Sequence, residues 1–93
     1  MLEFKTLKID ENQKTCVIGE EPIHLSKSEY LLLTFLLKNR NKIFSREELI
    51  ESAWAKPVIV RAVDTAISRL RSKLKIYSKN IETRPGFGYG FIE

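Results

Sequence analysis

One segment, residues 61–75, separates cleanly into an apolar face and a cationic face when it is read with helical periodicity. At about 100° per residue, its apolar side chains fall on a single stripe, which consists of Val63, Ala66, Ile67, Leu70 and Leu74. A stripe this regular predicts an amphipathic helix over 61–75. The rest of the chain must therefore supply a core for that stripe to pack against.

The outward face of this expected helix combines short hydroxyl side chains with cations. Opposite the apolar stripe lie Arg61, Thr65, Ser68 and Ser72, and the segment carries four further cations, Arg69, Arg71, Lys73 and Lys75, against the single acid Asp64. Short hydroxyls permit a close approach to a partner, and guanidinium groups suit phosphates and base edges. The alternative is a solvated basic helix, which is a common surface feature. The segment alone does not decide between them.

The distribution of charge favours binding to a polyanion. The formal net charge is +4, and hydrophobic residues make up 43% of the chain, as in globular proteins. Residues 1–60 hold nine Lys/Arg and nine Asp/Glu, whereas residues 61–93 hold seven and three, so that 7 − 3 = +4. The whole positive excess thus lies in the last third of the chain, which is the pattern of a localised nucleic-acid site.

Residues that carry catalytic or metal chemistry are scarce. Cys16 is the only cysteine, so an internal disulfide is excluded, and a cytoplasmic protein without membrane contact is expected. His24 has no partner at metal-ligand spacing. The glycines of 86–90 are assigned to a hairpin, because a phosphate loop would open a helix. We therefore expect no enzyme, no metal site and no cofactor.

The chain before the basic helix predicts an antiparallel β-meander followed by two helices. Strands are expected at 2–9, 14–18 and 23–25, separated by polar turns. Two capping boxes, 26–29 and 45–48, each open a helix. The first helix is apolar nearly all round, which is typical of a central core helix, and Pro57 is expected to stop the second.

The chain after the second helix contains an apolar loop, the basic helix and a hairpin. Val58-Ile59-Val60 either packs back on Trp54 or forms a protein-contact patch. Residues 77–80 read as a polar connection. Two strands within 81–92 are expected around a type II turn, with Pro85 and Gly86 at its centre.

Antiparallel strands, a three-helix core with a basic third helix, and a C-terminal β-hairpin make an α+β winged helix-turn-helix in one domain, residues 1–93. This combination resembles the DNA-binding effector domain of the OmpR/PhoB family of response regulators. The matching stretches are Ser45-Arg46-Glu47-Glu48-Leu49, Arg61-Ala62-Val63-Asp64, Ile67-Ser68-Arg69-Leu70-Arg71, Ile81-Glu82-Thr83 and Gly86-Phe87-Gly88-Tyr89.

The resemblance implies a transcriptional regulator of two-component systems that binds double-stranded DNA sequence-specifically. Its recognition helix 61–75 would enter the major groove, and its wing 81–92 would contact the minor groove and backbone. Such domains usually bind tandem direct repeats as head-to-tail homodimers, and the loop at 55–60 can contact RNA polymerase. The alternative function is a protein-interaction module that uses Val58-Ile59-Val60.

Matching positions give the candidate DNA-binding residues. Arg69 and Thr65 are assigned to bases, and the phosphate contacts are assigned to Arg61, Ser68, Arg71 and Lys73, with Ser72 on the same face. Thr83, Arg84 and Tyr89 are assigned to the wing, where Tyr89 either supports a phosphate contact or only packs. Asp64 is expected to be structural, favouring the helix N-terminus or pairing with Arg61. The wing departs from the family at Pro85, where an Arg is common.

Overall fold

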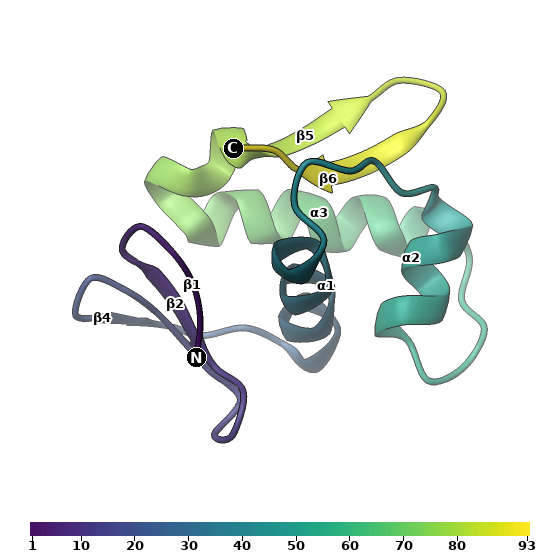
Figure 1. The fold of residues 1–93 in the computed structure, drawn as a ribbon. Coiled ribbons are helices and arrows are strands. Elements are labelled where there is room, and N and C mark those ends of the chain that lie inside the picture. The colour runs from purple at the N-terminus through teal and green to yellow at the C-terminus, as the bar shows by residue number, and fades with distance from the viewer.

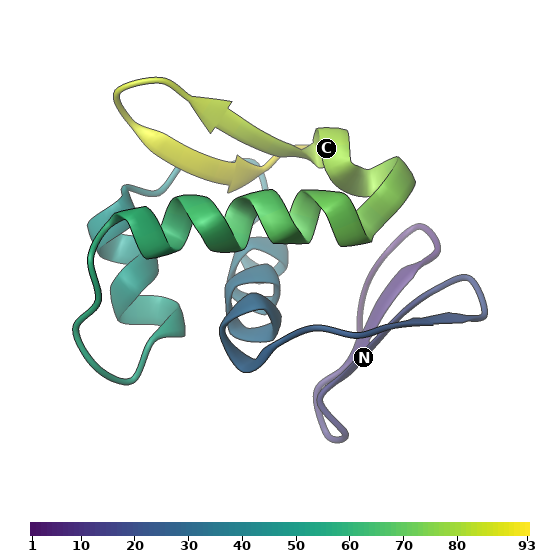
Figure 2. The same ribbon diagram turned by 180° about the vertical axis from the view of Figure 1, so that it is seen from behind.

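The computed structural model describes residues 1–93 and confirms the winged helix-turn-helix architecture (Figures 1 and 2). An antiparallel sheet holds the first four strands in the order β1 (Leu2–Phe4), β2 (Leu7–Asp10), β3 (Thr15–Ile18) and β4 (Glu21–Ile23). The helices are α1 (Lys27–Lys38), α2 (Arg46–Ala53), α3 (Arg61–Leu74) and the 3₁₀ helix η1 (Lys75–Asn80). A hairpin of β5 (Ile81–Arg84) and β6 (Gly88–Phe91), called the wing below, completes the fold. No helix combines the length and the apolar character that a membrane crossing requires.

The sheet contains one more turn than the sequence predicts. The expected strand 2–9 is divided by a two-residue turn at Lys5 and Thr6, so that Phe4 pairs with Leu7. Lys5 adopts a positive φ of 53°. Tight hairpin turns usually place glycine, asparagine or aspartate at such a position, and none is present here. The turn therefore left no signal in the sequence.

The last strand of the sheet also begins earlier than expected. β4 starts at Glu21 and includes Pro22, which lies opposite Val17 of β3. The sequence alone predicts a turn at this proline and a strand at 23–25. Proline is tolerated because β4 lies at an edge of the sheet, where one side of the strand needs no hydrogen-bond donor.

The helices form as their end signals predict. Both capping boxes are present: Ser26 and Glu29 cap α1, and Ser45 and Glu48 cap α2. α1 is the central helix, because it contributes five side chains to one core of 20 buried residues that also includes the whole apolar stripe of α3. α2 ends at Ala53, ahead of Pro57, which agrees with the rule that helices stop before a proline.

Two connections differ from expectation. Residues 77–80 are part of η1, and Tyr77 is a core residue rather than part of a polar link: it is 4% exposed, and its hydroxyl accepts a hydrogen bond from the Thr6 N–H at 3.0 Å. The loop at 55–60 leaves Ile59 72% exposed, so the expected packing against Trp54 does not extend to this side chain.

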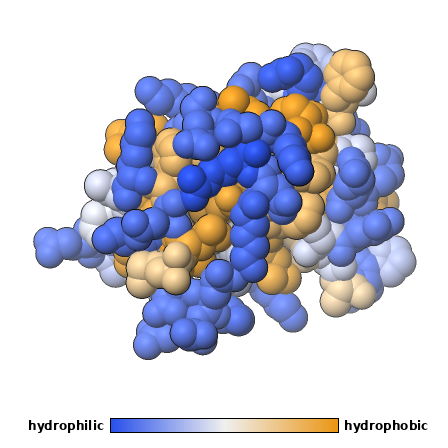
Figure 3. Space-filling view, viewed as in Figure 1, coloured by the Kyte–Doolittle hydropathy of each residue, from blue (hydrophilic) through white to orange (hydrophobic).

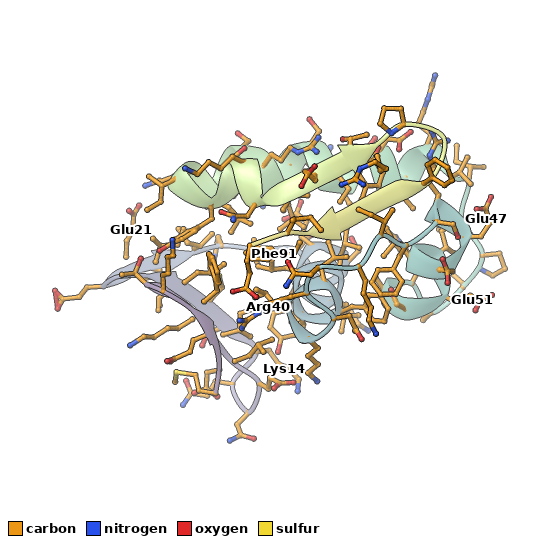
Figure 4. All side chains as sticks on the ribbon, turned by 45° about the horizontal axis from the view of Figure 1, so that its top comes forward. Lys14, Glu21, Arg40, Glu47, Glu51 and Phe91 are labelled. Carbon is orange, nitrogen blue, oxygen red and sulfur yellow. The ribbon has the colours of Figure 1, made fainter.

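The wing is attached to the body through the segment that joins α1 to α2. Phe44 and Tyr89 exchange two backbone hydrogen bonds, of 2.9 and 3.0 Å, which form an isolated antiparallel bridge. Phe91 of the wing, labelled in Figure 4, is fully buried. Its ring packs edge-on against that of Phe4 in the sheet, with 5.1 Å between the ring centroids. The predicted type II turn is present, with φ +83° at Gly86.

Glycine is required in β6 because two backbones approach each other closely there. A Cβ atom at Gly90 would lie 2.1 Å from the carbonyl oxygen of Lys42, and one at Gly88 would lie 1.8 Å from that of Phe44. The glycine-rich sequence of the hairpin thus serves the contact between the wing and the body.

We predict that Gly90→Ala lowers the free energy of unfolding by about 1–3 kcal/mol, because the methyl group forces two backbone segments apart. Urea unfolding followed by circular dichroism measures this change. Gly19→Ala is the comparison, since a Cβ at Gly19 meets nothing within 4 Å, although φ there is +64°. A Gly90→Ala variant no less stable than Gly19→Ala would contradict the close approach.

Candidate nucleic-acid interface

The outward face of α3 is free of intramolecular polar contacts. Its side chains are exposed, and none of them takes part in a hydrogen bond or ion pair in this structure; they are Arg61, Thr65, Ser68, Arg69 and Ser72. Seen from behind, α3 lies in the foreground along its full length, with the wing along one flank (Figure 2). Two guanidinium groups and three hydroxyls are therefore available for contact with a partner on one exposed face of the helix. The sequence-predicted face is brought together as expected, while its DNA contacts stay predictions.

Arg71, by contrast, is turned toward the wing. Its Nε and Nη2 atoms donate to the carbonyl oxygen of Ile81 at 3.0 and 2.7 Å, and Nη2 also donates to the hydroxyl of Thr83 at 2.7 Å. The guanidinium group lies 5.9 Å from the ring centre of Tyr89. Arg71 therefore ties the recognition helix to both strands of the wing. The sequence does not reveal this role of Arg71, because nothing local identifies a partner ten residues away.

Lys73 is also engaged within the protein. Its ammonium group donates to the Glu29 carboxylate at 2.6 Å, and the Glu29 side chain is only 3% exposed. Burial by itself raises the pKa of Glu29, but the hydrogen bonds from Lys73 and Ser26 outweigh it and hold that pKa below its ordinary value. Lys73 thus neutralises a buried carboxylate that also caps α1.

Asp64 joins three elements. Its carboxylate accepts a hydrogen bond from the Tyr89 hydroxyl at 2.6 Å and lies 3.3 Å from Nε of Arg46. The expected structural role is thereby found, but the partners come from β6 and α2 rather than from Arg61. Burial, and then the neighbouring Asp64 carboxylate, raise the pKa of Tyr89.

The contacts of Tyr89 lie within the protein. The residue is 9% exposed, its hydroxyl donates to Asp64, and its backbone N–H donates to the carbonyl oxygen of Phe44. The N–H through which a backbone contact to phosphate was expected is therefore occupied. Tyr89 holds the wing against α3, which is the packing alternative that the sequence left open.

The tip of the wing and the start of α2 enclose a hollow of about 260 Å³. Cations stand on both sides of it: Arg46 at the start of α2, and Arg84, whose only ion pair is an exposed one with Glu82 at 3.3 Å. The wing tip also carries Phe87, 72% exposed, and the apolar surface over this tip is visible in Figure 3. Sequence reasoning missed Arg46, although a cation in the first turn of the second helix was visible.

Two acidic side chains of α2, Glu47 and Glu51, lie one helical turn apart (Figure 4). Glu47 lines the hollow together with Arg46 and Arg84, so the lining carries charges of both signs. The two arginines on the open face of α3, in contrast, have no acidic partner. A polyanion would therefore be attracted to the open face of α3.

The sequence profile of the family described as "Transcriptional regulatory protein, C terminal" matches residues 19–91. The transcriptional regulatory protein SrrA of Staphylococcus aureus is 37% identical over 97 residues, which covers 98% of this chain and 40% of SrrA. The chain thus spans about two fifths of the length of the curated relatives that it matches.

Solved structures share the fold over nearly the whole chain. The DNA-binding domain of the response regulator AdeR, in complex with an intercistronic region, has a TM-score of 0.90 at 26% identity, with 100% of both chains covered. The Klebsiella pneumoniae RstA DNA-binding domain, in complex with the RstA box, has a TM-score of 0.85 at 30% identity and covers 97% and 94%. DrrB, an OmpR/PhoB homologue from Thermotoga maritima, has a TM-score of 0.86 at 38% identity and covers 98% of this chain and 43% of DrrB.

We predict that Lys73→Met destabilises the fold by about 1–3 kcal/mol at neutral pH, because it removes the partner of a buried charge. The native Glu29 pKa is depressed, so its contribution to stability is complete above the ordinary value of 4.5 and is lost as the pH falls through the lower, folded-state value. Without Lys73 the depression is reduced or lost. The stability difference between the variant and the native chain should therefore shrink as the pH falls below about 4.5.

Urea unfolding between pH 3 and 7 would measure this difference. Lys75→Met is the matched control, since it removes an ion pair with Glu21 in which both side chains are more than half exposed, and such pairs contribute little. Equal, pH-independent effects of the two variants would contradict the role given to Lys73.

Proposed function

Because the chain belongs to the OmpR/PhoB-type family of transcriptional regulatory C-terminal domains, we propose that residues 1–93 form one domain that binds double-stranded DNA sequence-specifically and regulates transcription. The observation that carries the proposal is the open face of α3, with its two free arginines and three hydroxyls beside a wing that is fixed to the same helix. The DNA complexes of the relatives AdeR and RstA support it.

α3 enters the major groove in this proposal. Arg69 reads guanine through its guanidinium group, and Thr65 presents its methyl group to thymine. Arg61 and Ser68 contact phosphates, with Ser72 on the same face. These side chains are exposed and have no partner in the protein, so binding DNA breaks no existing contact.

The wing and α2 supply the remaining phosphate contacts. Arg84 and Arg46 lie on either side of the hollow beneath the wing tip, and their intramolecular ion pairs, at 3.3 Å, are exposed and weak. Thr83 is exposed on β5. Arg71, Lys73 and Tyr89 act differently in this proposal: they fix the helix, the body and the wing relative to one another.

We also propose a cellular location, a mode of assembly on DNA and a protein partner for the domain. The domain acts in the cytoplasm as part of a two-component response regulator, binds tandem direct repeats, and assembles on them as a head-to-tail homodimer. The loop at 55–60 contacts RNA polymerase, for which the 72% exposure of Ile59 provides an apolar surface.

The same exposed loop favours a second candidate function, a winged helix that only binds proteins. Salt dependence separates the two. Three phosphate-neutralising arginines, at positions 46, 61 and 84, give a slope of log affinity against log salt of about −2.7, whereas an apolar protein contact gives a slope near zero. Selection of random duplex DNA at two salt concentrations supplies the operator and tests the proposal. Failure to bind any duplex at low salt would leave the protein-interaction function.

We predict that Arg69→Ala weakens binding to the selected operator by about 1–3 kcal/mol, because a base contact is lost. The difference in affinity between the operator and random DNA should therefore become smaller. Fluorescence anisotropy on both duplexes measures this. Lys79→Ala is the control, since it removes one exposed positive charge from η1, outside the proposed interface. Equal weakening on operator and random DNA would make Arg69 a phosphate contact.

Arg61→Ala should weaken binding to operator and random DNA alike, because a phosphate contact carries no sequence information. The magnitude of the salt slope should fall by about 0.9, which is the share of one released counterion. Titrations at four salt concentrations measure the slope. A changed base preference with an unchanged slope would move Arg61 to the bases.

A further inference from the structure

We infer that Phe87 is an apolar wedge, which enters the DNA minor groove next to the recognition-helix site and partly unstacks one base step. This inference rests on the proposed function, and it concerns how the wing contributes to specificity. The partner is duplex DNA at a deformable step, and the contact is made by an aromatic ring rather than by a hydrogen-bonding side chain.

The exposure of Phe87 is the first observation. An aromatic ring 72% exposed to solvent is unusual beside a core in which the other phenylalanines are buried or packed against it. The ring occupies the three-residue loop between β5 and β6, the outermost point of the wing (Figure 1). In proteins that bind nucleic acids, exposed aromatic and apolar side chains stack on bases or wedge between base steps.

The second observation is that the backbone around Phe87 is held in place by hydrogen bonds. Its N–H donates to the Arg84 carbonyl at 2.9 Å, which closes the turn that holds Pro85 and Gly86. Behind the loop, β6 is bonded to Phe44, and Asp64 holds Tyr89. The ring is therefore carried by a loop whose position is fixed relative to α3. A side chain in a fixed position can act as a wedge that unstacks a base step.

Charge and chemistry at the tip are the third observation. Arg84 and Arg46 stand on both sides of the hollow behind Phe87, where they can hold the two phosphate backbones that border a minor groove. Pro85 has neither a charge nor an N–H, so the three-residue loop 85–87 itself carries no cation. The apolar ring is what the tip presents, and apolar wedges act at the minor groove by unstacking a base step.

This mode of contact predicts its own sequence preference. The minor groove distinguishes poorly between base pairs by hydrogen bonding, whereas pyrimidine–purine steps unstack most easily. The protein should therefore prefer TA or CA/TG at the step under the wing, at a position where no side chain contacts a base edge. The DNA should also bend there.

The experiment uses operator duplexes with 2-aminopurine placed in turn at each step flanking the recognition-helix site. The native protein should raise 2-aminopurine fluorescence at one flanking step and bend the duplex, as measured by energy transfer between its ends. Phe87→Ala should abolish both signals and weaken operator binding about tenfold, the range of one lost base–aromatic contact. Phe87→Leu should retain most of each signal, because leucine also acts as a wedge.

Two controls make the outcome decisive. Arg84→Ala should weaken binding but keep the fluorescence signal at the same step. The midpoint of thermal unfolding of Phe87→Ala should match that of the native chain, since the ring is exposed.

Native protein that binds its operator without unstacking or bending it would overturn the wedge while the proposed function stands. Unchanged operator affinity in Phe87→Ala would also overturn the wedge, and would indicate that Phe87 contacts a protein instead. Absence of any duplex binding by the native protein would instead remove the proposed function.

Discussion

The carboxylate of Asp64 is the point at which the three parts of the proposed interface meet. One oxygen accepts the Tyr89 hydroxyl from the wing and faces Arg46 from α2, while the residue itself belongs to α3. Arg71 adds a second connection, from α3 to Ile81 and Thr83 of the wing. A winged helix that contacts two grooves needs a fixed geometry between helix and hairpin, since a misplaced wing would lose its phosphates. The hydrogen bond from Tyr89 to Asp64 and those from Arg71 to the wing supply that geometry without using the open face of α3.

The five cations of residues 61–75 therefore divide into two groups with different physical roles. Arg61 and Arg69 project from the open face and have no protein partner. The other three are engaged within the protein: Arg71 by the wing, Lys73 by the buried carboxylate of Glu29 and Lys75 by Glu21. A count of positive charges overstates the number that are available to DNA. What the engaged cations contribute is preorganisation: the free arginines and the wing approach DNA in a set arrangement, and less ordering is left for the moment of binding.

The sequence predicted the features that local chemistry decides. Both capping boxes, the apolar stripe of α3 and the Pro85-Gly86 turn are signals within a few residues, and each is present in the structure. The turn at Lys5 was missed because its positive φ is adopted without a glycine. The partners of Arg71 and Lys73 were missed for another reason. A helical wheel gives the direction in which a residue leaves the axis, but long flexible side chains can bend back toward partners that only the tertiary fold brings near.

The wing departs from the family pattern at its tip, where Pro85 stands at a position that is commonly an arginine. Two positions further on, the loop carries the exposed Phe87. The glycines on either side of Tyr89 are required by the contact with Lys42 and Phe44, so the base of the hairpin has little freedom to change. The tip residues 85–87, in contrast, are exposed to solvent. A hairpin with a fixed base and an exposed tip allows the recognition chemistry of the wing to change while the core and the helix-turn-helix remain as they are.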